Sequence, residues 1–168
     1  ETFGFSGAQL ESVANEAAIY ALREKREKIE QTHLAEAVDK VMLGEKTDRK
    51  ATKEERKRVA VHELGHAIIS EVVRPGSVSQ VALSPRGKAL GYVRHHPLDE
   101  QYLYTKEEIE AQIQVALAGA VAEEMIFGNR STGSQNDFEQ ANRYTRLLIE
   151  SGLSDLGILN MELANKEQ

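Results

Sequence analysis

The sequence predicts a mainly α-helical protein with one small β-hairpin or short sheet. Three S/T-x-x-E/Q capping boxes, typical of helix starts, occur at Ser6–Gln9, Thr52–Glu55 and Thr105–Glu108. Each box is followed by apolar residues at helical spacing. Strand-like alternation is confined to a short region around residues 78–94, which has Pro-Gly on one side and His-Pro on the other. Helices therefore supply most of the predicted core.

Composition narrows the class of protein. The chain has 168 residues, 40% of them hydrophobic, which suits one ordinary domain plus a further segment. A net charge of −6 argues against a nucleic-acid partner. Cysteine is absent, so a disulfide scaffold and any thiolate metal site are excluded. We find no apolar run of membrane-spanning length and no signal-peptide pattern, and the opening residues resemble a cut through a longer protein.

Residues 1–48 form the first predicted unit. Ser6 caps a helix whose apolar residues lie on one side, and Thr32 is expected to cap a second helix that Gly44 closes. No partner surface for these two helices is evident. A charged stretch follows, and we place the domain boundary near residue 48, so that the second unit covers residues 49–168. The basic residues of this stretch are expected to form a solvated face: Arg49, Lys50, Lys53, Arg56, Lys57 and Arg58.

The second unit begins with a long helix that Thr52 caps and Pro75-Gly76 stops. Residues 78–83 and 90–94 read as two strands joined by a turn at residues 84–87, and His95-His96-Pro97 ends the second.

A helix from Thr105 to Gly128 comes next, and its alanines and a glycine keep it thin, which permits close helix packing. Residues 129–136 read as a loop. A last helix is expected to begin near Asp137 and to end at Gly152.

The long helix carries the pentapeptide His62-Glu63-Leu64-Gly65-His66, an H-E-x-x-H motif. Residues four apart lie on one helix face, so His62 and His66 can direct two imidazole nitrogens at one Zn²⁺ ion. Glu63 is placed to reach a water at that ion, as the general base of a zinc peptidase. Apolar residues surround the motif on every side, which predicts a helix that is buried all round.

A catalytic zinc usually takes three protein ligands. The residues alone leave five candidates for the third ligand: His95, His96, Glu123, Glu124 and Asp137. Preference is divided between Asp137 and the pair Glu123 and Glu124. Either glutamate could instead hydrogen-bond to a ligand histidine.

Three other interpretations stay open on the residues. The long helix could be a core helix whose histidines bond to backbone carbonyls. The chain could also be a catalytically silent oligomerisation module, or a stand-alone zinc peptidase without an ATPase. Glu63 in register with the two histidines favours catalysis.

Five stretches together resemble the FtsH-type, AAA-linked ATP-dependent zinc metalloproteases. They follow the family's order and span nearly the whole chain: G-F-S-G-A-Q-L through N-E-A-A at residues 4–18, H-E-x-G-H-A at 62–67, S-P-R-G-x-A-L-G at 84–91, L-A-G with A-E-E at 117–124, and S-T-G-x-x-N-D at 131–137.

The resemblance implies a helical zinc-peptidase domain at residues 49–168, preceded at residues 1–48 by the end of an ATPase lid. It implies Asp137 as the third zinc ligand beside His62 and His66, with Glu63 catalytic. It also implies a homo-hexamer that degrades unfolded or membrane proteins, with substrate pairing near Gly91.

Two features depart from the family pattern. Leu64 stands where alanine is usual, which adds bulk, and Ser134-Gln135 replaces Ala-Ser. A phosphate-binding G-x-x-x-x-G-K-[ST] loop is absent from the sequence, so ATP is expected only in an ATPase domain outside this chain. A membrane anchor is likewise expected elsewhere in the full-length protein, with the protease on the cytoplasmic or organelle-interior side.

Overall fold

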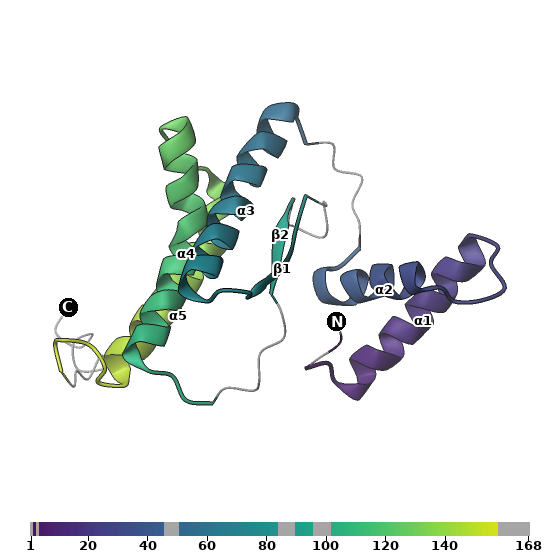
Figure 1. The fold of residues 1–168 in the computed structure, drawn as a ribbon, viewed down its shortest axis with the longest axis horizontal. Helices are drawn as coiled ribbons and strands as arrows, with labels where there is room; N and C mark the ends of the chain where they lie inside the picture. The colour runs from purple at the N-terminus through teal and green to yellow at the C-terminus, as the bar shows by residue number, and fades with distance from the viewer. Residues whose placement is uncertain (1, 3, 46–50, 84–89, 96–101, 158–168) are drawn as a thin grey trace, which may run out of the picture.

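A computed structural model describes residues 2, 4–45, 51–83, 90–95 and 102–157. The helices α1 and α2 form one hairpin, and α3, α4 and α5 lie together beside a two-stranded sheet (Figure 1). The elements follow one another as α1 Gly7–Arg23, α2 Gln31–Leu43, α3 Lys53–Val73, β1 Val78–Ala82, β2 Tyr92–His95, α4 Lys106–Phe127, the 3-10 turn η1 Thr132–Ser134, and α5 Gln135–Glu150. The predicted mainly helical class with a small hairpin is confirmed.

The predicted capping boxes at Ser6, Thr52 and Thr105 all form, and each hydroxyl accepts a backbone N–H three residues on. The second helix, α2, ends at Gly44 as predicted, but its predicted N-cap is wrong, because Glu30 and not Thr32 is the cap residue. The reason is His33, whose Nδ1 accepts the backbone N–H of Glu30 at 2.9 Å. A histidine thus does the work of the usual Glu or Gln of a capping box.

The helices α1 and α2 bury their apolar faces against each other. Val13 and Ala17 of α1 pack on Ala37 and Val38 of α2, all of them buried. Lys40 of α2 and Glu16 of α1 add an ion pair at 2.8 Å. The two helices therefore supply the partner surface that the sequence left unidentified.

Asp39 joins this pair of helices to the β-hairpin. Asp39 of α2 accepts a hydrogen bond from the Tyr92 hydroxyl at 3.3 Å and forms an ion pair with Arg94. Both partners lie on β2, so α2 is tied to the strand that runs beside α3.

The helices α3 and α4 cross at very close range. A Cβ placed on Gly65 of α3 would lie 2.6 Å from the Ala118 carbonyl oxygen and 2.7 Å from the Ala122 Cβ. Glycine in the H-E-x-x-H motif is therefore required by the backbone of α4. The thin middle of α4 permits this approach, as the sequence predicted.

The prediction that α3 is buried all round is wrong. Leu64, Ile68 and Val72 are 49%, 60% and 70% exposed. Residues four apart share a face, so these three form one exposed stripe. The helix α4 and the hairpin pack on α3 elsewhere, which leaves this face uncovered in the described part of the chain. The extra bulk of Leu64 therefore does not press on α4.

The strands β1 and β2 pair antiparallel, with Val81 opposite Val93 and an irregularity between Val78 and Gln80. The predicted turn at residues 84–87 and the His96-Pro97 strand end lie outside the described residues. The last helix, α5, begins at Gln135, slightly earlier than predicted, because η1 leads directly into it. Among the described helices, none is long and apolar enough to cross a membrane.

Candidate metal centre

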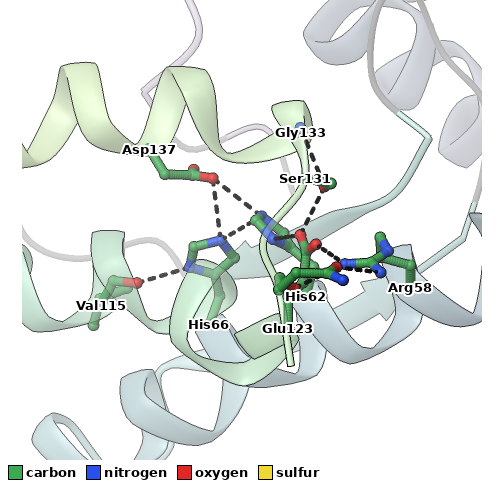
Figure 2. A network of polar contacts seen from close by, with 9 residues as sticks. Arg58, His62, His66, Val115, Glu123, Ser131, Gly133 and Asp137 are labelled. Carbon is green, nitrogen blue, oxygen red and sulfur yellow. Dashed lines mark hydrogen bonds and ion pairs between the residues drawn. The ribbon is translucent and has the colours of Figure 1, made fainter. Parts of the chain in front are cut away.

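Three side chains from two helices converge at one point (Figure 2). The Nε2 atoms of His62 and His66 on α3 lie 3.0 Å apart. An oxygen of Asp137, in the first turn of α5, lies 3.0 Å from Nε2 of His62 and 3.7 Å from Nε2 of His66. All three side chains are largely shielded from solvent.

The partners on the far side of each ring decide where the ring protons sit. Nδ1 of His62 lies 2.9 Å from Oε1 of Glu123, and Nδ1 of His66 lies 2.7 Å from the Val115 carbonyl oxygen. Both partners accept hydrogen bonds, so a neutral ring must donate from Nδ1 and keep a lone pair on Nε2.

The donor set therefore fits a metal cation. Two imidazole lone pairs and a carboxylate oxygen face one another, and an ion between them satisfies all three. A tetrahedral zinc with bonds of about 2.0–2.1 Å separates its ligand atoms by roughly 3.3 Å. The observed separations of 3.0, 3.0 and 3.7 Å bracket that value.

Gly119 of α4 makes room for the three groups. A Cβ on this residue would lie 2.5 Å from Nε2 of His66 and 2.7 Å from Nε2 of His62. Any side chain here would occupy the space where the ring nitrogens converge. The glycine in the thin helix is therefore part of the site.

Glu63 of α3 lies outside the converging trio. Its side chain lies against Gly91, the residue that precedes β2. A Cβ on Gly91 would lie 2.9 Å from Cγ and 3.1 Å from Oε1 of Glu63. Burial raises the pKa of the Glu63 carboxyl above its usual value, although His62 and His66 oppose the shift. A carboxylate next to a ligand histidine is a candidate to accept and return a proton.

The structure separates the candidates for the third position. The side chain of Glu123, 1% exposed, lies behind His62 and contacts Nδ1 rather than the converging atoms. Glu124 is exposed and pairs with Arg130 at 2.5 Å. His95 ends β2, exposed and outside the converging group, and His96 is outside the described residues. Only Asp137 joins the two histidines within the described part of the chain.

Glu123 is the centre of a second group of contacts. The sequence allowed a hydrogen bond from one of the two glutamates to a ligand histidine, but it did not predict the contacts of Glu123 with Arg58 and Ser131. Its carboxylate accepts from Arg58 at 2.8 Å, from His62 at 2.9 Å and from the Ser131 hydroxyl at 3.0 Å. Burial works to raise its pKa, but these three hydrogen bonds outweigh burial and hold the pKa below the usual value.

The expectation that Arg58 belongs to a solvated face is wrong. The only sequence signal for its role is its place one helical turn before His62, which puts both residues on one face of α3.

A helix bearing H-E-x-x-H, a distant carboxylate at the same point and a neighbouring glutamate define a metallopeptidase. The chain belongs to peptidase family M41, whose match covers residues 49–168. Residues 1–36 match the AAA+ lid domain. The family predicted from the five sequence stretches is thereby confirmed.

Curated relatives agree with this assignment. The chain is 43% identical over 162 residues to the ATP-dependent zinc metalloprotease FtsH of Acholeplasma laidlawii. The aligned region covers 95% of this chain and 25% of that relative. It is 40% identical over 171 residues to the protein of the same description from Rhodothermus marinus, covering 99% of this chain and 24% of the relative. The chain thus spans about a quarter of the length of these relatives.

Proposed function

We propose that this chain is the zinc-dependent endopeptidase part of an ATP-dependent protease that degrades unfolded or membrane proteins. The observation that carries the proposal is the convergence of His62, His66 and Asp137 beside Glu63. In this proposal His62, His66 and Asp137 hold Zn²⁺, and Glu63 is catalytic. Residues 49–168 form the peptidase domain, and residues 1–48 end the lid of an ATPase domain.

Zinc bound at this point supplies Lewis-acid chemistry, which activates water and polarises a peptide carbonyl. Glu63 accepts the proton of the attacking water and delivers it to the leaving amine. The place of Glu63 supports this role, because Glu63 follows His62 on α3 and its side chain lies against Gly91, just before β2. His62 and His66 keep their lone pairs on Nε2 because their Nδ1 protons are engaged elsewhere.

The hairpin is the proposed site of substrate contact. Gly91 precedes β2 and lies against Glu63, so an extended peptide running along the hairpin there would pass the catalytic carboxylate. Strand addition recognises peptide backbone rather than particular side chains. That mode suits a protease whose substrates share an unfolded state rather than a sequence.

The assembly is proposed from the comparisons. The match to an AAA+ lid and the printed description of the relatives as ATP-dependent support an attached ATPase motor that feeds the peptidase. We propose a homo-hexamer, anchored to a membrane by a segment outside this chain, with the protease on the cytoplasmic or organelle-interior side.

The test compares the full-length protein with its Glu63→Gln variant on unfolded casein and measures bound zinc in both. The proposal expects parent-level zinc and nearly complete loss of cleavage in the variant. A chelator should abolish parent cleavage, and zinc should restore it. Cleavage by Glu63→Gln at the parent rate would remove Glu63 from the chemistry. Zinc binding by the parent without peptide turnover would favour a non-catalytic module.

A further inference from the structure

We propose that Arg58 is a positioning residue of the metal centre. One guanidinium fixes both the carboxylate that orients His62 and the chain segment that leads to Asp137 (Figure 2). The inference rests on the proposed metal ligands and concerns a residue outside them.

The guanidinium makes three hydrogen bonds from two nitrogens. Nη1 donates to Oε2 of Glu123 at 2.8 Å and to the Asn129 carbonyl oxygen at 3.0 Å. Nη2 donates to Oδ1 of Asn129 at 2.9 Å. The group also lies 4.5 Å from the Phe127 ring centroid, which restricts it further. A planar fork held in this way has one orientation, which a lysine ammonium could not reproduce.

The first consequence concerns His62. The Glu123 carboxylate divides its oxygens, with Oε2 toward Arg58 and Oε1 toward Nδ1 of His62. Removing the guanidinium would leave Oε2 of this buried carboxylate without its cationic partner, and only the Oε1 contacts with His62 and Ser131 would then oppose its rotation. Rotation of Glu123 would loosen the His62 ring, whose Nε2 is one of the converging atoms.

The second consequence concerns Asp137. Arg58 holds Asn129 by both its backbone and its side chain, just after α4 ends. The Ser131 hydroxyl donates a hydrogen bond to Glu123 and accepts one from the backbone N–H of Gly133. Ser131 thereby caps the start of η1. The helix α5 follows η1 directly, with Asp137 in its first turn. The Arg58 contacts therefore fix the near end of the segment that delivers the carboxylate.

The test measures zinc affinity by chelator competition and the visible absorption of the Co²⁺-substituted protein, in the full-length protein. Arg58→Met keeps the apolar stem and loses all three hydrogen bonds. We expect zinc binding to weaken about 10–100-fold, the range for lost outer contacts of a ligand histidine. The Co²⁺ spectrum should change, because it reports the arrangement of ligands around the ion.

Lys57→Met is the matched control, since the Lys57 ammonium lies over the same Phe127 ring, 5.8 Å from its centroid. Its zinc affinity and Co²⁺ spectrum should equal those of the parent. Parent affinity in Arg58→Met would overturn the inference, and so would weaker binding with an unchanged spectrum.

Arg58→Lys keeps the test decisive if Arg58→Met does not fold. It retains a positive charge and loses the forked contact to Asn129, so its zinc affinity is expected to fall below that of the parent. Parent affinity and spectrum in this variant would also reject the inference. The proposed peptidase function fails separately, through casein cleavage by Glu63→Gln.

Discussion

Nδ1 of His62 lies 2.9 Å from Oε1 of Glu123, on the side of the ring opposite Asp137. The ring is therefore held between two carboxylates, one toward each nitrogen. Because Glu123 accepts a hydrogen bond from Nδ1–H, Nε2 presents its lone pair to the place where His66 and Asp137 converge.

Glu123→Ala should weaken zinc binding and destabilise the fold, because Glu123 both orients His62 and pairs with Arg58. Outer contacts of ligand histidines contribute about 10–100-fold in metal affinity. The variant also leaves Arg58, 27% exposed, without its anionic partner, so the free energy of unfolding should fall. Chelator competition and denaturant unfolding measure the two effects. The control is Glu124→Ala, whose exposed pair with Arg130 should contribute less than about 1 kcal/mol. Equal behaviour of both variants would contradict the assigned role.

Asp137→Asn should lower zinc retention while leaving the helices intact. An amide oxygen carries no charge, so the cation loses its only anionic partner in the trio. Metal analysis after dialysis against a chelator measures the loss, and circular dichroism checks the fold. Undiminished zinc would mean that another residue occupies the third position. Asp155→Asn, in a pair with Lys106 away from the site, serves as the control.

Gly119→Ala should abolish metal binding, although alanine is the better helix former by about 1 kcal/mol. Its Cβ would lie 2.5 Å from Nε2 of His66, where no real contact is found, so the rings must move apart. Isothermal titration with zinc tests this. Gly7→Ala, which has open space around its Cβ, should leave zinc binding unchanged. Normal zinc affinity in Gly119→Ala would show that α4 can withdraw without cost.

Removal of zinc should lower the thermal midpoint of unfolding of the peptidase domain. The ion would link α3, through His62 and His66, to α5, through Asp137. Ligand binding to the folded state adds stability that grows with ligand concentration. Scanning calorimetry with chelator, and then with added zinc, should show a fall and a recovery. Asp137→Asn should show a much smaller difference between the two conditions.

Asp39→Ala should loosen the hairpin without altering the metal site. Asp39 holds Tyr92 and Arg94, the two β2 residues that face α2. Hydrogen exchange of the β1 and β2 amides should accelerate, while exchange in α3 stays as in the parent. Glu11→Ala, on the exposed face of α1, is the control. Unchanged exchange in β2 would show that this contact does not hold the strand.

Local signals in the sequence determined much of this protein. The side-chain hydroxyls of Ser6, Thr52 and Thr105 mark helix starts because a capping box needs only four consecutive residues. The pair His62 and His66 is fixed by the pitch of a helix. The family could be predicted because its motifs recur in order along the chain.

Tertiary structure decided what depends on residues far apart in the chain. No periodicity announces that Gly119 faces the ring nitrogens, or that Arg58 reaches Glu123 and Asn129 instead of solvent. The prediction that α3 is buried all round was wrong for the same reason, since the exposed stripe depends on where α4 and the β-hairpin pack. A helix sequence fixes which residues share a face, whereas only the packing of other elements decides what each face meets.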